Sequence, residues 1–128
     1  MNPAPPPVSL PGCKSLTQRG LLLAATADGE SVLRGCNKGE DASGLRACLG
    51  LLGVEIRQEG ESTRVVGRAG ALAGTGVALD VQEGGSTLRF LLAQVAAGGG
   101  EALFCGSPRL MERPHGGLLD CLTGMGAT

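Results

Sequence analysis

The residues with the clearest chemistry near the N-terminus are Lys14, Ser15 and Arg19, which follow the turn Leu10-Pro11-Gly12-Cys13. They stand at the start of an apolar run with the composition of a helix. A helix begins with unsatisfied backbone N–H groups and a partial positive charge, which together make a seat for a phosphate or carboxylate. Lys14 and Ser15 can reach such an anion, and Arg19, four residues beyond Ser15, lies on the same helical face. One interpretation of the segment is therefore an anion clamp.

The alternative for this segment is an ordinary helix start, with a serine cap and solvated basic side chains. Short local matches of this kind arise often by chance. Taken by itself, the segment favours that alternative. Whether it binds an anion depends on whether other segments of the chain bring further anion-binding residues to the same place.

A second anion-binding pattern lies in the other half of the chain, at Gly84-Gly85-Ser86-Thr87-Leu88-Arg89. Glycine lets a backbone approach a ligand closely, and Gly85 precedes a hydroxyl and a cation at the start of another apolar run. Arg89 follows Ser86 by three residues and so lies near the same helical face. The alternative is a serine-capped helix start with Arg89 exposed.

A third basic cluster is Pro108-Arg109-Leu110-Met111-Glu112-Arg113-Pro114. Arg113 directly precedes a proline and is biased away from helical backbone, so we expect it to project from a constrained loop. The alternative is a solvated charged loop in which Glu112 offsets the arginine. The only histidine, His115, is expected to cap or line the following helix, since without a carboxylate or cysteine partner it is a poor catalytic candidate.

The elements that must position these residues alternate between helices and strands. Apolar spacing and turn residues predict helices over residues 16–27, 40–53, 87–95 and 118–122, and strands over 31–34, 54–58, 63–67, 77–81 and 102–105. Gly20, Gly44 and Gly50 fall inside predicted helices, where each costs about 1 kcal/mol against alanine. Packing must therefore supply most of the helix stability. The alternation predicts an α/β fold (α+β in some schemes) with helices covering sheets.

Composition excludes several classes of protein. The 128 residues suit one ordinary domain, and 11 Lys and Arg against 12 Asp and Glu indicate no general affinity for nucleic acid or anionic membranes. Only two aromatic side chains occur, Phe90 and Phe104, too few for stacking platforms. The widely spaced cysteines are expected to be buried or half-buried free thiols of a reducing compartment; they are Cys13, Cys36, Cys48, Cys105 and Cys121.

The N-terminal residues 1–8 are proline-rich and lack the basic and apolar regions of a signal peptide. No stretch reaches the roughly 20 apolar residues that a membrane-spanning helix needs. We therefore expect a cytoplasmic chain with a proline-rich leader over 1–8 and one partial domain over 9–128.

Taken in order, residues 10–19, 83–89 and 108–114 resemble the family of 3-phosphoshikimate 1-carboxyvinyltransferase, also called EPSP synthase. The stretches Asp28-Gly29-Glu30-Ser31 and Leu51-Leu52-Gly53-Val54 fit the same pattern. The resemblance runs from about Ser9 to Ala127 and covers the first quarter to third of the family's usual length. The sister family of UDP-N-acetylglucosamine enolpyruvyl transferases has Lys-Asn where this chain has Lys14-Ser15, and is the less similar of the two.

The resemblance implies the enolpyruvate transferase fold, made of repeated βαβαββ units, with about one and a half units of an N-terminal domain in this chain. It implies that Lys14, Ser15 and Arg19 bind shikimate 3-phosphate. By the same resemblance Lys14, Gly85 and Arg113 would bind phosphoenolpyruvate, and Ser86 and Arg89 would support the pocket. The family's reaction moves the enolpyruvyl group of phosphoenolpyruvate to the 5-hydroxyl of shikimate 3-phosphate in aromatic amino acid biosynthesis, without a metal or organic cofactor.

Some positions depart from the family pattern: Cys13 replaces a usual serine, Gly84 a usual alanine or serine, and Phe90 a common proline. None of these changes removes a charged contact. The resemblance places the catalytic residues of the proton transfers beyond residue 128, so we expect the chain to need the remainder of the enzyme. Two functions stay open: a transferase fragment or split subunit that acts when joined to the rest, and a non-catalytic remnant or anion-binding module.

Overall fold

The computed structural model describes residues 9–128, so the proline-rich leader expected over residues 1–8 lies outside the described residues. Along the chain the elements are α1 (Lys14–Thr26), β1 (Glu30–Arg34), α2 (Glu40–Leu51), β2 (Glu55–Glu59), β3 (Ser62–Val66), β4 (Thr75–Asp80), α3 (Gly85–Ala97), β5 (Glu101–Cys105), α4 (Pro108–Met111) and α5 (Gly116–Gly124). This order confirms the predicted alternation and the mixed α/β fold. One element, α4, stands where a loop is expected.

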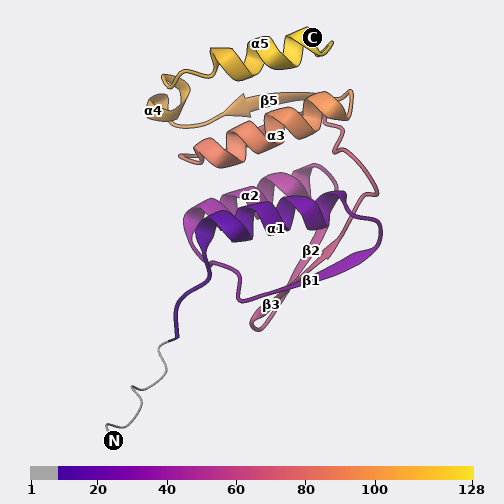
Figure 1. The fold of residues 1–128 in the computed structure, drawn as a ribbon, viewed down its shortest axis with the longest axis vertical. Coiled ribbons are helices and arrows are strands. Elements are labelled where there is room, and N and C mark those ends of the chain that lie inside the picture. The colour runs from indigo at the N-terminus through magenta and orange to yellow at the C-terminus, as the bar shows by residue number, and fades with distance from the viewer. Residues whose placement is uncertain (1–8) are drawn as a thin grey trace, which may run out of the picture.

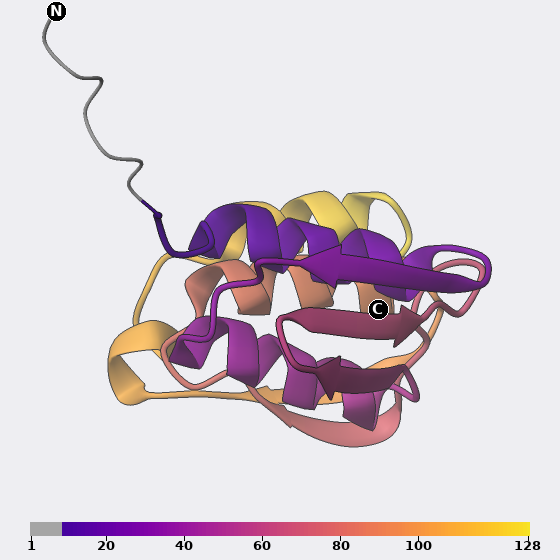
Figure 2. The ribbon, with the colours of Figure 1, turned by 90° about the horizontal axis from the view of Figure 1, so that it is seen from below.

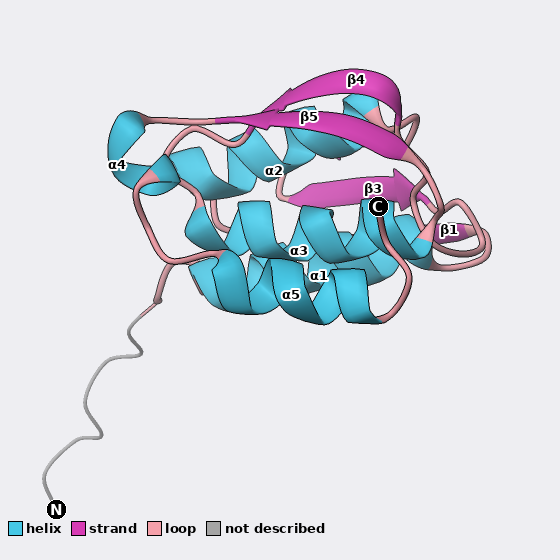
Figure 3. Ribbon diagram, turned by 90° about the horizontal axis from the view of Figure 1, so that it is seen from above, coloured by secondary structure: helices cyan, strands magenta, loops and turns pink. Residues whose placement is uncertain are grey.

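The strands form two sheets. β1, β3 and β2 lie side by side in that order and pair antiparallel, with Val65 of β3 opposite both Ser31 and Ile56. This sheet lies against α1 and α2 (Figure 2). β4 and β5 pair in parallel and are joined through α3, as a parallel pair requires a long crossover. Figure 3 shows these two strands together on one side of the helices.

The helices form because their apolar residues recur at helical spacing. In α1 the buried apolar residues Leu21, Ala24 and Ala25 lie on one helical face, and in α3 Leu88, Leu91 and Val95 follow one another at intervals of three and four. α1 begins at Lys14, two residues before the predicted start, so Lys14 and Ser15 belong to its first turn.

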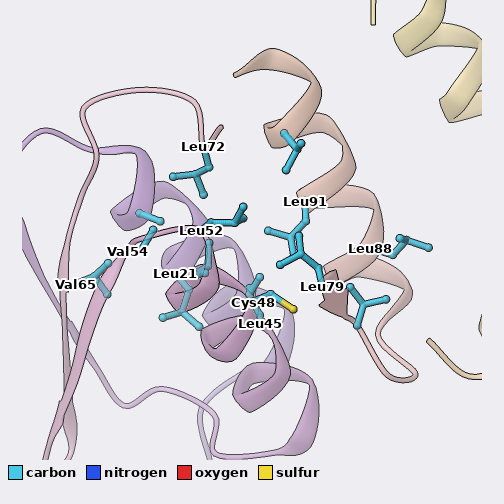
Figure 4. Close-up of a cluster of buried hydrophobic side chains, with 14 of the residues drawn as sticks. Leu21, Leu45, Cys48, Leu52, Val54, Val65, Leu72, Leu79, Leu88 and Leu91 are labelled. Carbon is cyan, nitrogen blue, oxygen red and sulfur yellow. The ribbon is translucent and has the colours of Figure 1, made fainter. Parts of the chain in front are cut away.

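A single aliphatic core joins the two halves of the chain. Leu21 of α1 and Leu45 of α2 face Leu79 of β4 and Leu91 of α3, and all four are fully buried (Figure 4). Burying a leucine side chain contributes about 1.5–3 kcal/mol, so this cluster fixes α3 against α1 and α2. The N-terminal ends of α1 and α3 consequently keep a defined separation.

The short helix α4 was not predicted because four residues are too few to show a helical period. Its start carries two local signals: Pro108 occupies the first turn, and the Ser107 hydroxyl accepts a hydrogen bond from the Leu110 N–H (3.2 Å). Arg113 lies in the loop after α4, as predicted.

The expectation of buried cysteines is wrong for three of the five. Cys48 is buried and Cys36 partly buried, whereas the exposed thiols are Cys13, Cys105 and Cys121. Cys105 falls on the exposed side of the alternation along β5, and Cys13 directly precedes α1. Burial raises the pKa of the Cys48 thiol, with a smaller contribution from the Asp80 carboxylate. Within residues 9–128, no helix is long and apolar enough to cross a membrane.

Candidate functional site

A cavity of about 470 Å³ opens where the N-terminal ends of α1 and α3 meet the loop between α4 and α5. These ends lie on the same side of the molecule, at the left of Figure 1. The lining is mostly polar and consists of Lys14, Gln18, Asp41, Glu83, Gly85, Ser86, Arg89, Arg113 and His115. A neighbouring cavity of about 250 Å³ shares Lys14, Asp41 and Glu83 and extends to the start of α2. The three predicted basic clusters therefore meet at one place.

A larger hollow, of about 890 Å³, lies elsewhere, between α3, β5 and α5. Its lining is dominated by glycine and aliphatic side chains, and Glu101 is the one ionisable side chain among the described residues that line it. A polyanion would find no cation there, so we place the candidate site in the 470 Å³ cavity.

Helix ends supply part of the positive potential of this cavity. The starts of α1 and α3 have no side-chain cap and no acidic residue in the first turn, as far as residues 9–128 show. The first N–H groups of such helices lack acceptors within the helix, and the helix dipole adds a partial positive charge. By contrast, α2 carries Glu40 and Asp41 in its first turn, which offset its dipole. The starts of α1 and α3 are therefore the better anion seats.

The turn before α1 is held by close backbone packing. A Cβ atom on Gly12 would lie 2.0 Å from the Gly35 carbonyl oxygen, so only glycine fits. The Asn37 side-chain amide donates to the Gly12 carbonyl (2.8 Å), and the Asn37 backbone N–H donates to Thr17 Oγ1 (2.9 Å). These contacts fix the direction in which α1, and with it Lys14, enters the cavity.

Lys14 already has a partner. Its Nζ lies 2.8 Å from Asp41 Oδ2, and the two side chains are 61% and 27% exposed. An exposed ion pair of this kind contributes about 0–1 kcal/mol. A phosphate that binds Lys14 must therefore compete with the Asp41 carboxylate, and Glu83 adds a second negative charge to the lining.

Gly85 and Arg113 lie next to each other in the lining of the cavity. A Cβ atom on Gly85 would lie 3.0 Å from Arg113 Nη1, so the guanidinium lies over the start of α3. The Gly85 N–H donates to the Glu83 carbonyl (3.0 Å), and an anion bound there must take over that hydrogen. The loop is held by His115, whose Nε2 lies 2.9 Å from the Leu110 carbonyl and must donate, because a carbonyl oxygen only accepts.

Ser15 and Arg19 do not line the cavity. Arg19 Nη1 donates to the Ser15 carbonyl (3.2 Å) and contacts Ser15 Oγ, which bears out the predicted shared face. The Arg19 guanidinium lies over the Phe90 ring, 5.4 Å from its centroid, so it spans α1 and α3. Five of the seven predicted residues thus line the cavity, and these two adjoin it.

Four lining residues were not among the predicted site residues: Gln18, Asp41, Glu83 and His115. Gln18 follows Lys14 by four residues, so the spacing argument used for Arg19 would have found it. Glu83 directly precedes the glycine pair. Asp41 had no local signal, because α2 approaches α1 only in the folded chain. Among residues 9–128, no three His, Cys, Asp or Glu side chains gather as metal ligands.

The fold and this lining define a mixed α/β protein with a polar cavity built from two helix starts and three cations. Comparisons with known proteins identify it further. The family model of EPSP synthase (3-phosphoshikimate 1-carboxyvinyltransferase) matches residues 5–128, and the chain belongs to this family. The family assignment made from the three motifs is confirmed.

The similar proteins are much longer. The 3-phosphoshikimate 1-carboxyvinyltransferase of Ralstonia pickettii is 41% identical over 121 residues, which are 94% of this chain and 28% of that protein. The protein of the same description from Nostoc punctiforme is 40% identical over 99% of this chain and 30% of its own length. The solved EPSP synthase of Acinetobacter baumannii superposes with a TM-score of 0.80 at 25% identity, over 94% of this chain and 28% of that one. The chain therefore spans under a third of the length of these relatives.

Proposed function

We propose that this chain forms the part of a 3-phosphoshikimate 1-carboxyvinyltransferase that receives the phosphate and carboxylate groups of shikimate 3-phosphate and phosphoenolpyruvate. The observation that carries the proposal is the convergence of Lys14, Gly85 and Arg113, from three separate elements, on one cavity. Both substrates are polyanions, and bringing two polyanions together requires cations and N–H donors that are already in place. The relatives' shared description supports this choice of substrates.

Within the proposal, Lys14, Ser15 and Arg19 bind shikimate 3-phosphate. Arg19 reaches it by leaving Phe90, a rotation that an exposed arginine side chain can make. Lys14 and Arg113 take the charged groups of phosphoenolpyruvate, and the backbone at Gly85 donates to them. Ser86 and Arg89 line the same wall and support both ligands.

The proposal includes the reaction only together with the remaining length that the relatives have. In the reaction the 5-hydroxyl of shikimate 3-phosphate adds to the enolpyruvyl double bond and phosphate then leaves; the proton transfers are assigned to residues beyond 128. No cofactor is required, and the location is cytoplasmic. The element order α1-β1-α2-β2-β3 followed by β4-α3-β5-α5 supports the repeated βαβαββ unit as the underlying plan.

The second candidate function is that of an anion-binding module without turnover. It is favoured by the charged groups of the cavity, which are three cations and two carboxylates. One carboxylate, Asp41, is already paired with Lys14, and the other, Glu83, lies just before the start of α3. Release of phosphate from phosphoenolpyruvate plus shikimate 3-phosphate separates the two. Because the first proposal also expects no turnover from the 128 residues alone, the assay uses the chain joined to the remaining length that its relatives have. Phosphate release there would exclude the module, whereas binding without phosphate release would support it.

Binding itself is tested by calorimetric titration of the chain with each substrate. The chain contains only two lysines, which provides a matched control. Lys14→Ala should weaken binding of shikimate 3-phosphate about tenfold, the usual loss for one charge-assisted hydrogen bond. Lys38→Ala should leave it unchanged, because Lys38 is exposed and pairs with Glu61 (2.9 Å) outside the cavity lining. Equal affinity of the Lys14→Ala variant and the unchanged chain would contradict the site.

A further inference from the structure

One polar side chain of the cavity is buried and reaches across to the other half of the chain. Gln18 of α1 is 2% exposed and Thr87 of α3 is 1% exposed. Gln18 Nε2 donates to Thr87 Oγ1 (3.2 Å), a hydrogen bond between residues 69 apart in sequence. A buried polar group is retained only where it is paired, so this contact specifies how α1 and α3 lie against each other.

This hydrogen bond also lies beside the cavity, between the two helices whose starts line it. Gln18 lines the cavity, one helical turn beyond Lys14, whereas Thr87 is not part of the lining and comes two residues after Gly85. The Gln18–Thr87 bond is therefore a buried hydrogen bond between the two helices whose starts face the anion. The packed core leucines fix how the helices lie overall, and the directional Gln18–Thr87 bond adds a local constraint near their starts.

We propose that Gln18 is a positioning residue of the anion site, holding the starts of α1 and α3 at the spacing and rotation that let Lys14 and the Gly85 backbone act on ligands in one cavity. The inference rests on the proposed function for the choice of ligand. It goes beyond that function because it assigns anion affinity to a hydrogen bond whose partner, Thr87, cannot touch the ligand.

Thr87 offers a clean perturbation, since it does not line the cavity and its hydroxyl accepts the hydrogen bond from Gln18. Thr87→Val keeps the shape of the side chain and removes the hydroxyl, whereas Thr87→Ser keeps the hydroxyl and removes a methyl group. We expect Thr87→Val to weaken binding of shikimate 3-phosphate about tenfold, the loss of one well-placed hydrogen bond, and Thr87→Ser to stay within about twofold of the unchanged chain. Affinity that is the same in both variants would overturn the proposal, whatever happens to the melting temperature.

A merely structural role is separated by the double variant Gln18→Met/Thr87→Val. Replacing both partners of a buried hydrogen bond by apolar groups restores much of the stability lost in a single variant. The proposal expects this double variant to melt within a few degrees of the unchanged chain and still to bind shikimate 3-phosphate about tenfold more weakly. Recovery of affinity together with stability would show that the bond acts on folding alone.

A measurement without ligand keeps this inference distinct from the proposed function. If the unchanged chain binds neither shikimate 3-phosphate nor phosphoenolpyruvate, the proposed function fails, but the link between the helices is still tested by ¹H–¹⁵N spectra. Thr87→Val should shift the backbone amide resonance of Lys14, on the other helix, and Thr87→Ser should leave it in place. An unmoved Lys14 resonance in Thr87→Val would overturn the positioning role.

Discussion

The substitution Gly85→Ala should stabilise the fold and weaken the site at the same time. Gly85 is the first residue of α3, and its φ angle is not among the positive ones, so alanine can adopt the same backbone. Replacing such a glycine stabilises a protein by about 0.4–1 kcal/mol, because the unfolded chain loses conformational freedom. For a domain of this size that raises the melting temperature by about 2–4 °C.

The new methyl group decides the second effect. It would lie 3.0 Å from Arg113 Nη1 and 3.7 Å from Leu110 Cδ1. Arg113 is exposed and ends in a flexible side chain, so it can move away at little energetic cost. The movement takes its guanidinium from the start of α3, and the methyl group occupies the space where an anion would approach the backbone. Losing one charge-assisted hydrogen bond of about 1.5–3 kcal/mol weakens phosphoenolpyruvate binding about ten- to a hundredfold.

Calorimetry measures both effects, with scanning for stability and titration for affinity. The matched control is Gly50→Ala in α2, where the added Cβ atom meets nothing within 4 Å. This control should raise stability by about 1 kcal/mol and leave affinity unchanged. A stable Gly85→Ala variant with unchanged affinity for phosphoenolpyruvate would refute the assignment of Gly85 to the site. A destabilised variant would refute the claim that Arg113 yields easily.

Three further predictions concern other parts of the site and the core. Asp41→Asn should raise the affinity for shikimate 3-phosphate about twofold, because it frees an exposed Lys14, and the gain should vanish in titrations at high salt. Gly12→Ala should lower the free energy of unfolding in urea by about 1–3 kcal/mol, since its Cβ atom would collide with the Gly35 carbonyl, and an unchanged urea midpoint would contradict that packing. The raised pKa of the buried Cys48 thiol favours its neutral form in the folded chain, so the stabilisation is present below the thiol's ordinary pKa of 9.0 and is lost as pH rises through the folded value. The unfolding free energy should therefore fall more between pH 8 and pH 11 in the unchanged chain than in Cys48→Ala, and parallel curves would contradict it.

The parts of this molecule that could be predicted from sequence are those with local causes. The helix starts at Lys14 and near Gly85 follow from a turn, a glycine and an apolar period, and each of these acts within a few residues. The arrival of Arg113 at the same cavity could be anticipated only through the family resemblance. Local spacing places a residue on a helical face but does not say which other helix, strand or loop that face packs against.

What could not be predicted depends on contacts between distant segments. Asp41 pairs with Lys14 because α2 packs beside α1, and Gln18 meets Thr87 because one core joins the two halves. The exposed Cys105 was assigned to the interior because its residue type is usually buried; packing of the β4–β5 pair against α2 determines which face of these strands is covered. In each case the deciding partner lies more than 20 residues away.

The cations of the cavity contribute different amounts to the free energy of anion binding. Lys14 must leave Asp41 when it takes a phosphate, so the net gain is the difference between two ion pairs. Arg89 and Arg113 form no ion pair with any residue of the described part of the chain, and their attraction to an anion is not reduced by an existing partner. The start of α3, with Arg113 over it, is therefore the stronger seat, and Lys14 adds most when the ligand carries enough charge to displace a carboxylate. Lys14 should therefore prefer a doubly charged phosphate to a singly charged carboxylate. The proposal that Lys14 binds both substrates requires this preference.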